Sequence, residues 1–93
     1  MCVVTVTFQI HPEQIDAFLP LIIDNARVSR QSEAGCQLFD ICRDMNEVFL
    51  YEVYDDRAAF DTHLGSKHFK AFDAAIQHMV VDKHIRLFDE VIR

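Results

Sequence analysis

Glycine, proline and tryptophan are scarce in this chain, whose 93 residues include two Gly, two Pro and no Trp. Two glycines cannot supply the glycine-rich loop that cradles the phosphates of nucleotide cofactors, so we expect no flavin or nicotinamide site. The three cysteines are odd in number and form no C-x-x-C pair, which argues against a disulfide framework. We therefore expect free thiols, a reducing cytoplasmic location and, if the protein is an enzyme, chemistry that needs no cofactor.

Positive charge and long apolar runs are also lacking. Nine Lys and Arg stand against fifteen Asp and Glu, a formal charge of −6 that opposes binding to phosphate backbones. No apolar run approaches the roughly 20 residues that a membrane-spanning helix needs. The first ten residues, MCVVTVTFQI, lack a basic lead and alternate like a strand, so we do not expect a signal peptide. Nucleic acid and membrane are therefore not expected partners.

Hydrophobic residues are abundant for so short a chain, at 51%, with eight Phe and two Tyr. The length suits one domain, which we place at residues 2–92. A domain of this size buries only about 60 to 65% of its unfolded surface, so it is marginally stable alone. A partner subunit that covers part of the apolar surface would resolve this, and we expect a homodimer.

Periodicity divides the chain into alternating strand and helix patterns. In chain order, we predict a strand at 2–10, a helix at 12–31, strands at 36–43 and 47–54, helices at 56–64 and 67–80, and a strand at 84–92. Residues 44–46 read as a hairpin turn. Pro20 should kink the first helix. Asp55 or Asp56 is positioned to cap the second helix, and Ser66 to cap the third.

This order of elements predicts an α+β fold of the ferredoxin-like type, a four-stranded antiparallel sheet with helices on one face. The other face of the sheet still needs a cover. Both faces of the hairpin strands are rich in apolar residues. Leu38, Phe49, Tyr51 and Val53 are therefore candidates for a contact between two sheets in a dimer.

Polar side chains within apolar segments are the candidate functional residues, because burying them unpaired is costly. They are Asn25, Ser29, Asp40, Glu52, His63 and His68. If the helices cover the sheet, these residues can converge on one pocket. Aromatic residues from four segments could line it: Phe39, Tyr54, Phe60, Phe69 and Phe72.

Each candidate also has a plain structural interpretation, because buried polar groups are usually just hydrogen-bonded. Asn25 and Ser29 could satisfy loop carbonyls, Glu52 could be an exposed strand residue, and His63 a core histidine. The Phe residues could simply be core. Composition and spacing alone leave these alternatives open.

A histidine suits proton transfer at neutral pH, since its pKa lies near 7 without much adjustment. The segment HLGSKHF carries His63 and His68 five positions apart, with no Cys or carboxylate nearby at metal-ligand spacing. We therefore expect acid–base chemistry and no metal centre. A pocket walled by Phe would accept a planar or small hydrophobic carbonyl compound.

Two stretches, EAGCQLFDICRD and FLYEVYDDRAAFDTHLGSKHFKAF, resemble the antibiotic biosynthesis monooxygenase (ABM) family. The shared pattern runs E-x-G-C-x-x-F-D, then Y-E-x-Y-x-D-x-x-A-F-x-x-H-x-x-x-x-H-F, and the likeness covers about residues 2–92. The resemblance implies a dimeric α+β barrel of ferredoxin-like subunits. Several members oxygenate phenols or quinols without metal or flavin, because the deprotonated substrate itself passes an electron to oxygen.

The resemblance implies roles for particular residues. His63 or His68 would ionise the substrate, Glu52 would orient the histidine, and Asn25 would donate to the developing oxyanion. The substrate would contact the remaining candidates: Ser29, Phe39, Asp40, Tyr54, Phe60, Phe69 and Phe72.

Other branches of the family leave alternatives. The haem-degrading branch relies on a Trp that this chain lacks. An isomerase branch acts on a phosphorylated product of autoinducer-2, and the run NARVSRQSEAGCQLFD is similar to it. Arg27, Arg30 and Lys67 could serve as its phosphate-binding cations. A non-catalytic ligand-binding domain is the third alternative, since fold alone does not fix function.

Overall fold

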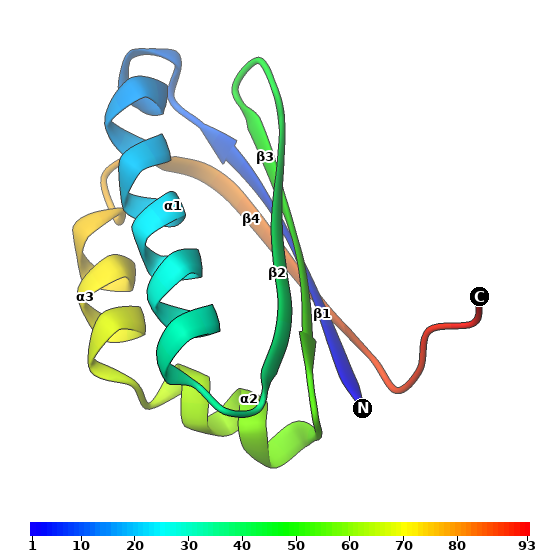
Figure 1. The fold of residues 1–93 in the computed structure, drawn as a ribbon. Coiled ribbons are helices and arrows are strands. Elements are labelled where there is room, and N and C mark those ends of the chain that lie inside the picture. Colours follow the sequence, from blue (N-terminus) through cyan, green and yellow to red (C-terminus); the bar gives the residue numbers. More distant parts are fainter.

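The computed structural model describes residues 1–93 as one layer of helices against one sheet (Figure 1). In chain order the elements are β1 (Cys2–Ile10), a 3-10 turn η1 (Pro12–Gln14), α1 (Ile15–Ser32), β2 (Cys36–Asp44), β3 (Glu47–Tyr54), α2 (Arg57–Leu64), α3 (Lys67–Ala75) and β4 (Val80–Phe88). The strands form one antiparallel sheet in the order β2-β3-β1-β4. The predicted ferredoxin-like α+β fold is confirmed. None of the helices combines the length and the hydrophobicity that a membrane-spanning segment requires.

Local sequence accounts for the helix boundaries. The Asp56 carboxylate accepts a hydrogen bond from the Ala59 amide (2.8 Å), and the Ser66 hydroxyl accepts one from the Phe69 amide (3.2 Å), so both predicted caps are confirmed. α1 contains Pro20 and buries one stripe of residues at spacings of three and four.

Two predicted boundaries are wrong. The third helix ends at Ala75 rather than at 80, and the last strand spans Val80–Phe88 rather than 84–92. The pairing of β4 with β1 explains where β4 ends. Val3, near the start of β1, pairs with Phe88, so the chain beyond Phe88 has no strand opposite it.

The core lies between the helices and the sheet. Phe8 on β1, Phe18 on α1 and Phe72 on α3 pack edge to face, with ring centroids 5.2 to 6.5 Å apart. Gly35, before β2, permits a close approach of α2, because a Cβ at this position would lie 2.5 Å from the Cβ of Ala59. The three cysteines are free, as expected.

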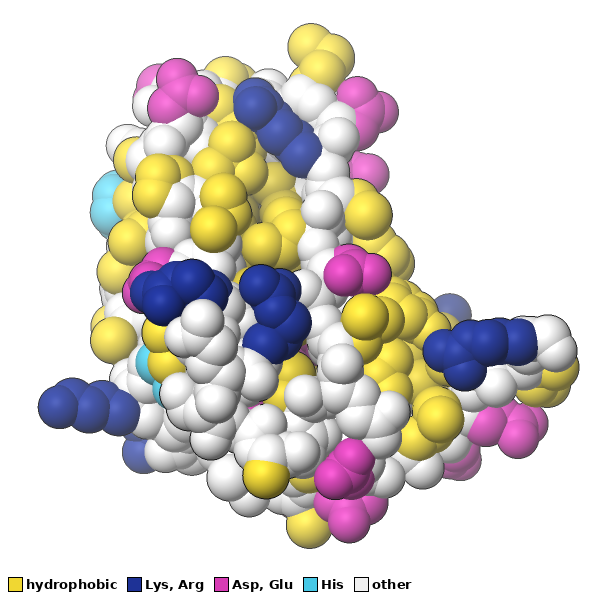
Figure 2. Space-filling model, in the orientation of Figure 1, with side chains coloured by type: hydrophobic (Ala, Val, Ile, Leu, Met, Phe, Trp, Pro, Cys, Tyr) yellow, Lys and Arg dark blue, Asp and Glu magenta, His cyan; other side chains and the backbone are white.

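The sheet face opposite the helices carries the residues predicted to contact a partner. Leu38, Phe49 and Tyr51 are half-buried and Val53 is buried, and on β3 they alternate with residues that face the helices. Figure 2 shows hydrophobic side chains gathered on this side of the molecule.

Candidate functional site

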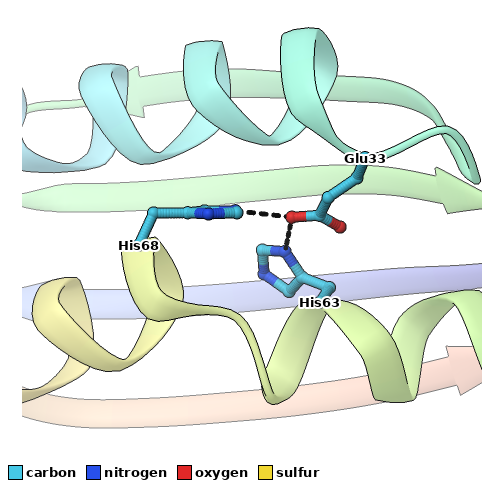
Figure 3. Close-up of side chains that lie close together, drawn as sticks. All are labelled: Glu33, His63 and His68. Atoms are coloured by element: carbon cyan, nitrogen blue, oxygen red, sulfur yellow. Dashed lines mark hydrogen bonds and ion pairs between the residues drawn. The ribbon is translucent and has the colours of Figure 1, made fainter.

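Three titratable side chains from distant parts of the chain meet between the helices and the sheet (Figure 3). Glu33 lies just after α1, His63 in the last turn of α2, and His68 in the first turn of α3. One carboxylate oxygen, Glu33 Oε2, lies 2.8 Å from His63 Nδ1 and 2.5 Å from His68 Nε2. A single carboxylate thus holds both imidazoles.

The junction between α2 and α3 positions the two histidines. Gly65 ends α2, and its amide bonds the Asp61 carbonyl (3.1 Å). Ser66 then caps α3 and donates its hydroxyl to the His63 carbonyl (2.6 Å). Because Ser66 contacts both helices, it fixes the angle at which His68 faces His63.

Glu33 and its neighbours on α1 complete the cluster. The Glu33 amide bonds the Ser29 carbonyl (3.0 Å), which ends α1 and turns the carboxylate toward the histidines. The Ser29 hydroxyl donates to the Asn25 carbonyl (2.7 Å), and its oxygen lies 3.1 Å from His68 Nε2 and 3.4 Å from His63 Nδ1. Ser29 is therefore placed to accept a hydrogen bond from either imidazole.

The contact with Glu33 sets the proton positions on His63. A carboxylate accepts, so Nδ1 carries the proton and donates, which leaves Nε2 with a free lone pair. The His63 side chain is only 3% exposed. Burial lowers the pKa of His63, while the hydrogen bond and charge of Glu33 act in the opposite direction. The ring is therefore held neutral and in one tautomer.

His63 forms part of the wall of a small apolar cavity of about 40 Å³. The cavity lies between α1, α2, α3 and the sheet, and its wall includes Asn25, Glu52, His63, Lys83 and four Phe residues among those predicted: Phe39, Phe60, Phe69 and Phe72. Typical ligand pockets hold about 300 to 1,000 Å³. A drug-sized compound therefore fits only when rim side chains such as Leu64 and Ile85 move.

Glu52 is a second titratable group in the cavity wall. It is 3% exposed, and its carboxylate accepts a hydrogen bond from the Tyr54 hydroxyl (2.6 Å). Burial raises the pKa of Glu52 to about 7, against the lowering effects of the Tyr54 hydrogen bond and the Lys83 charge. Burial also raises the pKa of Tyr54, so that hydroxyl stays protonated and donates.

The remaining predicted residues fall into three positions. The side chain of Asn25 lines the cavity, and its Oδ1 is buried without a hydrogen-bond partner. Ser29 and Tyr54 are buried beside the cavity but do not line it. Asp40 is exposed and outside the cavity, because it neighbours Phe39 on β2 and successive strand residues point to opposite faces.

His68 differs from His63 in its surroundings. Its side chain is 20% exposed and lines a separate groove of about 300 Å³ between α1 and α3. His63 therefore faces the cavity and His68 faces the groove, with Glu33 between them.

Sequence patterns do not predict two residues of the candidate site. Glu33 appears only as the first letter of E-x-G-C, and the carboxylate that contacts both histidines is Glu33, whereas Glu52 bonds Tyr54. Lys83 on β4 is the second. Its ammonium lies 5.4 Å from the centre of the Phe8 ring at the cavity wall, whereas Arg27 pairs with Asp24 and Arg30 donates to the Phe39 carbonyl.

Comparison with known proteins agrees with this fold. The family model for antibiotic biosynthesis monooxygenase matches residues 1–75. A crystal structure of an antibiotic biosynthesis monooxygenase is 30% identical, covers 99% of this chain and 100% of its own, and superimposes with a TM-score of 0.91. No curated protein matches the chain.

More distant structures share the fold alone. A Mycobacterium tuberculosis protein is 23% identical, with 99% of this chain and 96% of that chain covered and a TM-score of 0.91. A Pseudomonas aeruginosa protein is 21% identical, with 98% and 94% covered and a TM-score of 0.89. The chain belongs to the antibiotic biosynthesis monooxygenase family.

Proposed function

We propose that the protein is a cofactor-independent monooxygenase of a small aromatic or quinol-like compound. The observation that carries this proposal is the buried His63, whose Nδ1 contacts Glu33 and whose side chain forms part of the wall of a Phe-lined cavity. A neutral imidazole of this kind can act as a general base at neutral pH without a further change in its pKa. Membership of the family supports the oxygenation step.

The reaction begins when His63 Nε2 removes a proton from the substrate. The electron-rich anion then transfers electrons to O₂, one oxygen atom enters the ring carbon, and the other leaves as water. Let SH₂ be the substrate, written as its keto tautomer with two hydrogens on the reacting ring carbon. The balanced reaction is then SH₂ + O₂ → S=O + H₂O. The substrate supplies all four electrons, so no external reductant enters.

Other cavity groups have matching roles. Asn25 would contact the substrate oxygen, and Lys83 would supply a positive charge, since both residues line the cavity. A cation there favours the ionised form of a phenol or enol. The Phe side chains exclude water, which strengthens both electrostatic contacts.

The test is oxygen uptake by metal-free protein against a panel of quinols and polyphenols. We expect uptake that is lost in His63→Ala and kept in His78→Ala, which removes an exposed histidine. A flat trace across the panel, or equal uptake by His63→Ala, would contradict the proposal.

A second candidate is the isomerisation of a phosphorylated carbonyl compound derived from autoinducer-2. Glu52 and His63 line the same cavity; the pKa of Glu52 is raised and that of His63 is lowered. Such a pair suits a proton shift between two carbons, because one group can give a proton while the other takes one. This reaction consumes no oxygen and is inhibited by phosphate. A third candidate, non-catalytic ligand binding, predicts that His63→Ala and His68→Ala leave ligand binding and any cellular phenotype unchanged.

The proposed assembly is a homodimer that covers the helix-free face of the sheet, in the cytoplasm. The half-buried Leu38, Phe49 and Tyr51 and the free thiols support these two points. Light scattering of Tyr51→Glu should report a monomer where the parent protein is a dimer. A monomeric parent would contradict the proposed assembly.

A further inference from the structure

Four polar atoms converge on one point on the side of His63 that carries Nδ1. They are Glu33 Oε2, His63 Nδ1, His68 Nε2 and Ser29 Oγ. The first three lie within 4.8 Å of one another. The separations between neighbouring pairs run from 2.5 to 3.4 Å. Two imidazoles, a carboxylate and a hydroxyl thus surround a common centre.

These separations are close to those of a metal site. Around a tetrahedral Zn²⁺ ion with bonds of about 2.0 to 2.2 Å, neighbouring ligand atoms are about 3.3 to 3.6 Å apart. Ser29 Oγ and His63 Nδ1 fall in this range, at 3.4 Å, and Ser29 Oγ and His68 Nε2 are slightly closer, at 3.1 Å. The Glu33 contacts, at 2.8 and 2.5 Å, would need to open by about 0.5 to 1 Å, a small side-chain movement.

The unused oxygen of Glu33 is an independent indication of a ligand. The Glu33 side chain is 8% exposed, and Oε1 is buried with no hydrogen-bond partner. A buried carboxylate oxygen without a partner is costly. A cation bound beside Oε2 would compensate its negative charge directly.

We propose that Glu33, His63 and His68 form a binding site for a transition-metal ion of the Zn²⁺ class, and that the bound ion switches off the base. An imidazole that gives its Nδ1 lone pair to a metal keeps its proton on Nε2. The ring proton therefore moves from Nδ1 to Nε2, and His63 presents a donor to the cavity in place of a lone pair. The binding part stands on the cluster, and the inhibitory part rests on the proposed function.

Access and ligand type both agree with this class of ion. His68 lines the groove between α1 and α3, with Asp24 at the same groove, so an ion reaches the cluster without passing through the cavity. Nitrogen ligands favour Zn²⁺, Co²⁺, Ni²⁺ and Cu²⁺ over Mg²⁺ and Ca²⁺, which take oxygen ligands.

The binding test is calorimetric titration of ZnCl₂ into tag-free, chelator-treated protein. It is done in a Cys42→Ser background, because Cys42 is the exposed thiol. We expect one Zn²⁺ per chain and a rise in melting temperature. Glu33→Gln and His68→Gln should each weaken binding at least tenfold. His84→Gln, which removes an exposed imidazole 3.0 Å from Asp82, should leave it unchanged.

Absence of binding in the parent overturns the site, as does unchanged affinity in both Glu33→Gln and His68→Gln. Should Glu33→Gln fail to fold, the Zn²⁺ affinity of His68→Gln still tests the site, because His68 is more exposed.

The switch is tested separately. Zn²⁺ should abolish oxygen uptake, a chelator should restore it, and His68→Gln should need at least tenfold more Zn²⁺. Nitrogen-15 spectra of the imidazoles report the tautomer of His63 without substrate. Zn²⁺ should place the His63 proton on Nε2. Full activity at saturating Zn²⁺, or an unchanged tautomer, overturns the switch. Binding without any quinol turnover would count against the proposed function and leave the metal site standing.

Discussion

Glu33 and His63 lie thirty positions apart in the chain, yet Glu33 Oε2 and His63 Nδ1 are 2.8 Å apart. Both side chains are more than nine-tenths buried. The contact fixes which nitrogen of His63 carries the proton, and so decides whether this residue can act as a base.

Replacing Glu33 by Gln should lower kcat for oxygen uptake about 100-fold, the scale of losing an oriented general base. The amide keeps the size of the side chain but no longer fixes the proton on Nδ1 of His63. Steady-state kinetics of the variant measure the effect. Glu47→Gln, an exposed change on β3, is the matched control. Equal kcat in the parent and in Glu33→Gln would remove Glu33 from the mechanism.

Glu52 should make folding stability depend on pH. Its folded pKa, about 7, is raised above the ordinary value of 4.5 by burial. Between these values the folded state binds more protons, so the free energy of unfolding falls as pH rises from about 4.5 to about 7, then levels off. The fall is about 3 kcal/mol, at about 1.4 kcal/mol per pKa unit.

Urea unfolding at several pH values measures this effect. In Glu52→Gln, where the amide oxygen can still accept from Tyr54, the fall over this range should shrink. The exposed Glu90→Gln serves as control and should keep the parent profile. A fall that persists unchanged in Glu52→Gln would assign it to another group.

Gly35→Ala should destabilise the protein by about 1 to 3 kcal/mol, the usual cost of overpacking. The added methyl would meet the Ala59 Cβ at 2.5 Å. Ala59→Gly opens space and costs about 1 kcal/mol by itself in a helix. In a double-mutant cycle the two changes together should cost less than their sum, and simple additivity would show that no clash occurs.

Lys83→Gln should raise KM for ionised phenols several-fold and leave kcat less affected, since the charge acts on binding. Lys83→Arg should restore most of the loss. Arg86→Gln is the matched control, because Arg86 pairs with Thr5 and faces the other side of the sheet. The KM of an uncharged substrate analogue should not respond to any of these changes. If Lys83→Gln leaves KM unchanged for phenols across their pKa range, Lys83 has no role in binding.

Sequence reasoning succeeds where one segment decides the outcome. The stripe of Phe18, Ile22 and Ala26 in α1 and the caps at Asp56 and Ser66 depend on nearby residues, so periodicity and side-chain type predict them. The last strand depends on a distant partner. Its end is set by where β1 begins, a fact that residues 84–92 do not contain.

The site shows the same division. The Phe wall, Asn25 and His63 could be predicted because each interrupts or continues an apolar pattern. Glu33 could not, since it follows a helix where an exposed carboxylate is ordinary, and its partners His63 and His68 come from distant helices. Residues close in sequence to His63 and His68 offer no further metal ligand, whereas the fold brings in the Glu33 carboxylate from thirty residues away.

The small volume of the cavity has a consequence for how the protein selects its ligands. A quinol-sized compound is larger than a space of about 40 Å³, so it would bind only molecules in which the rim has opened. Its apparent affinity is the intrinsic affinity multiplied by the open fraction. Discrimination by size then resides in the free energy of opening at Leu64 and Ile85, and less in the shape of the cavity wall. Relatives with the same catalytic residues and different rims would therefore accept different compounds.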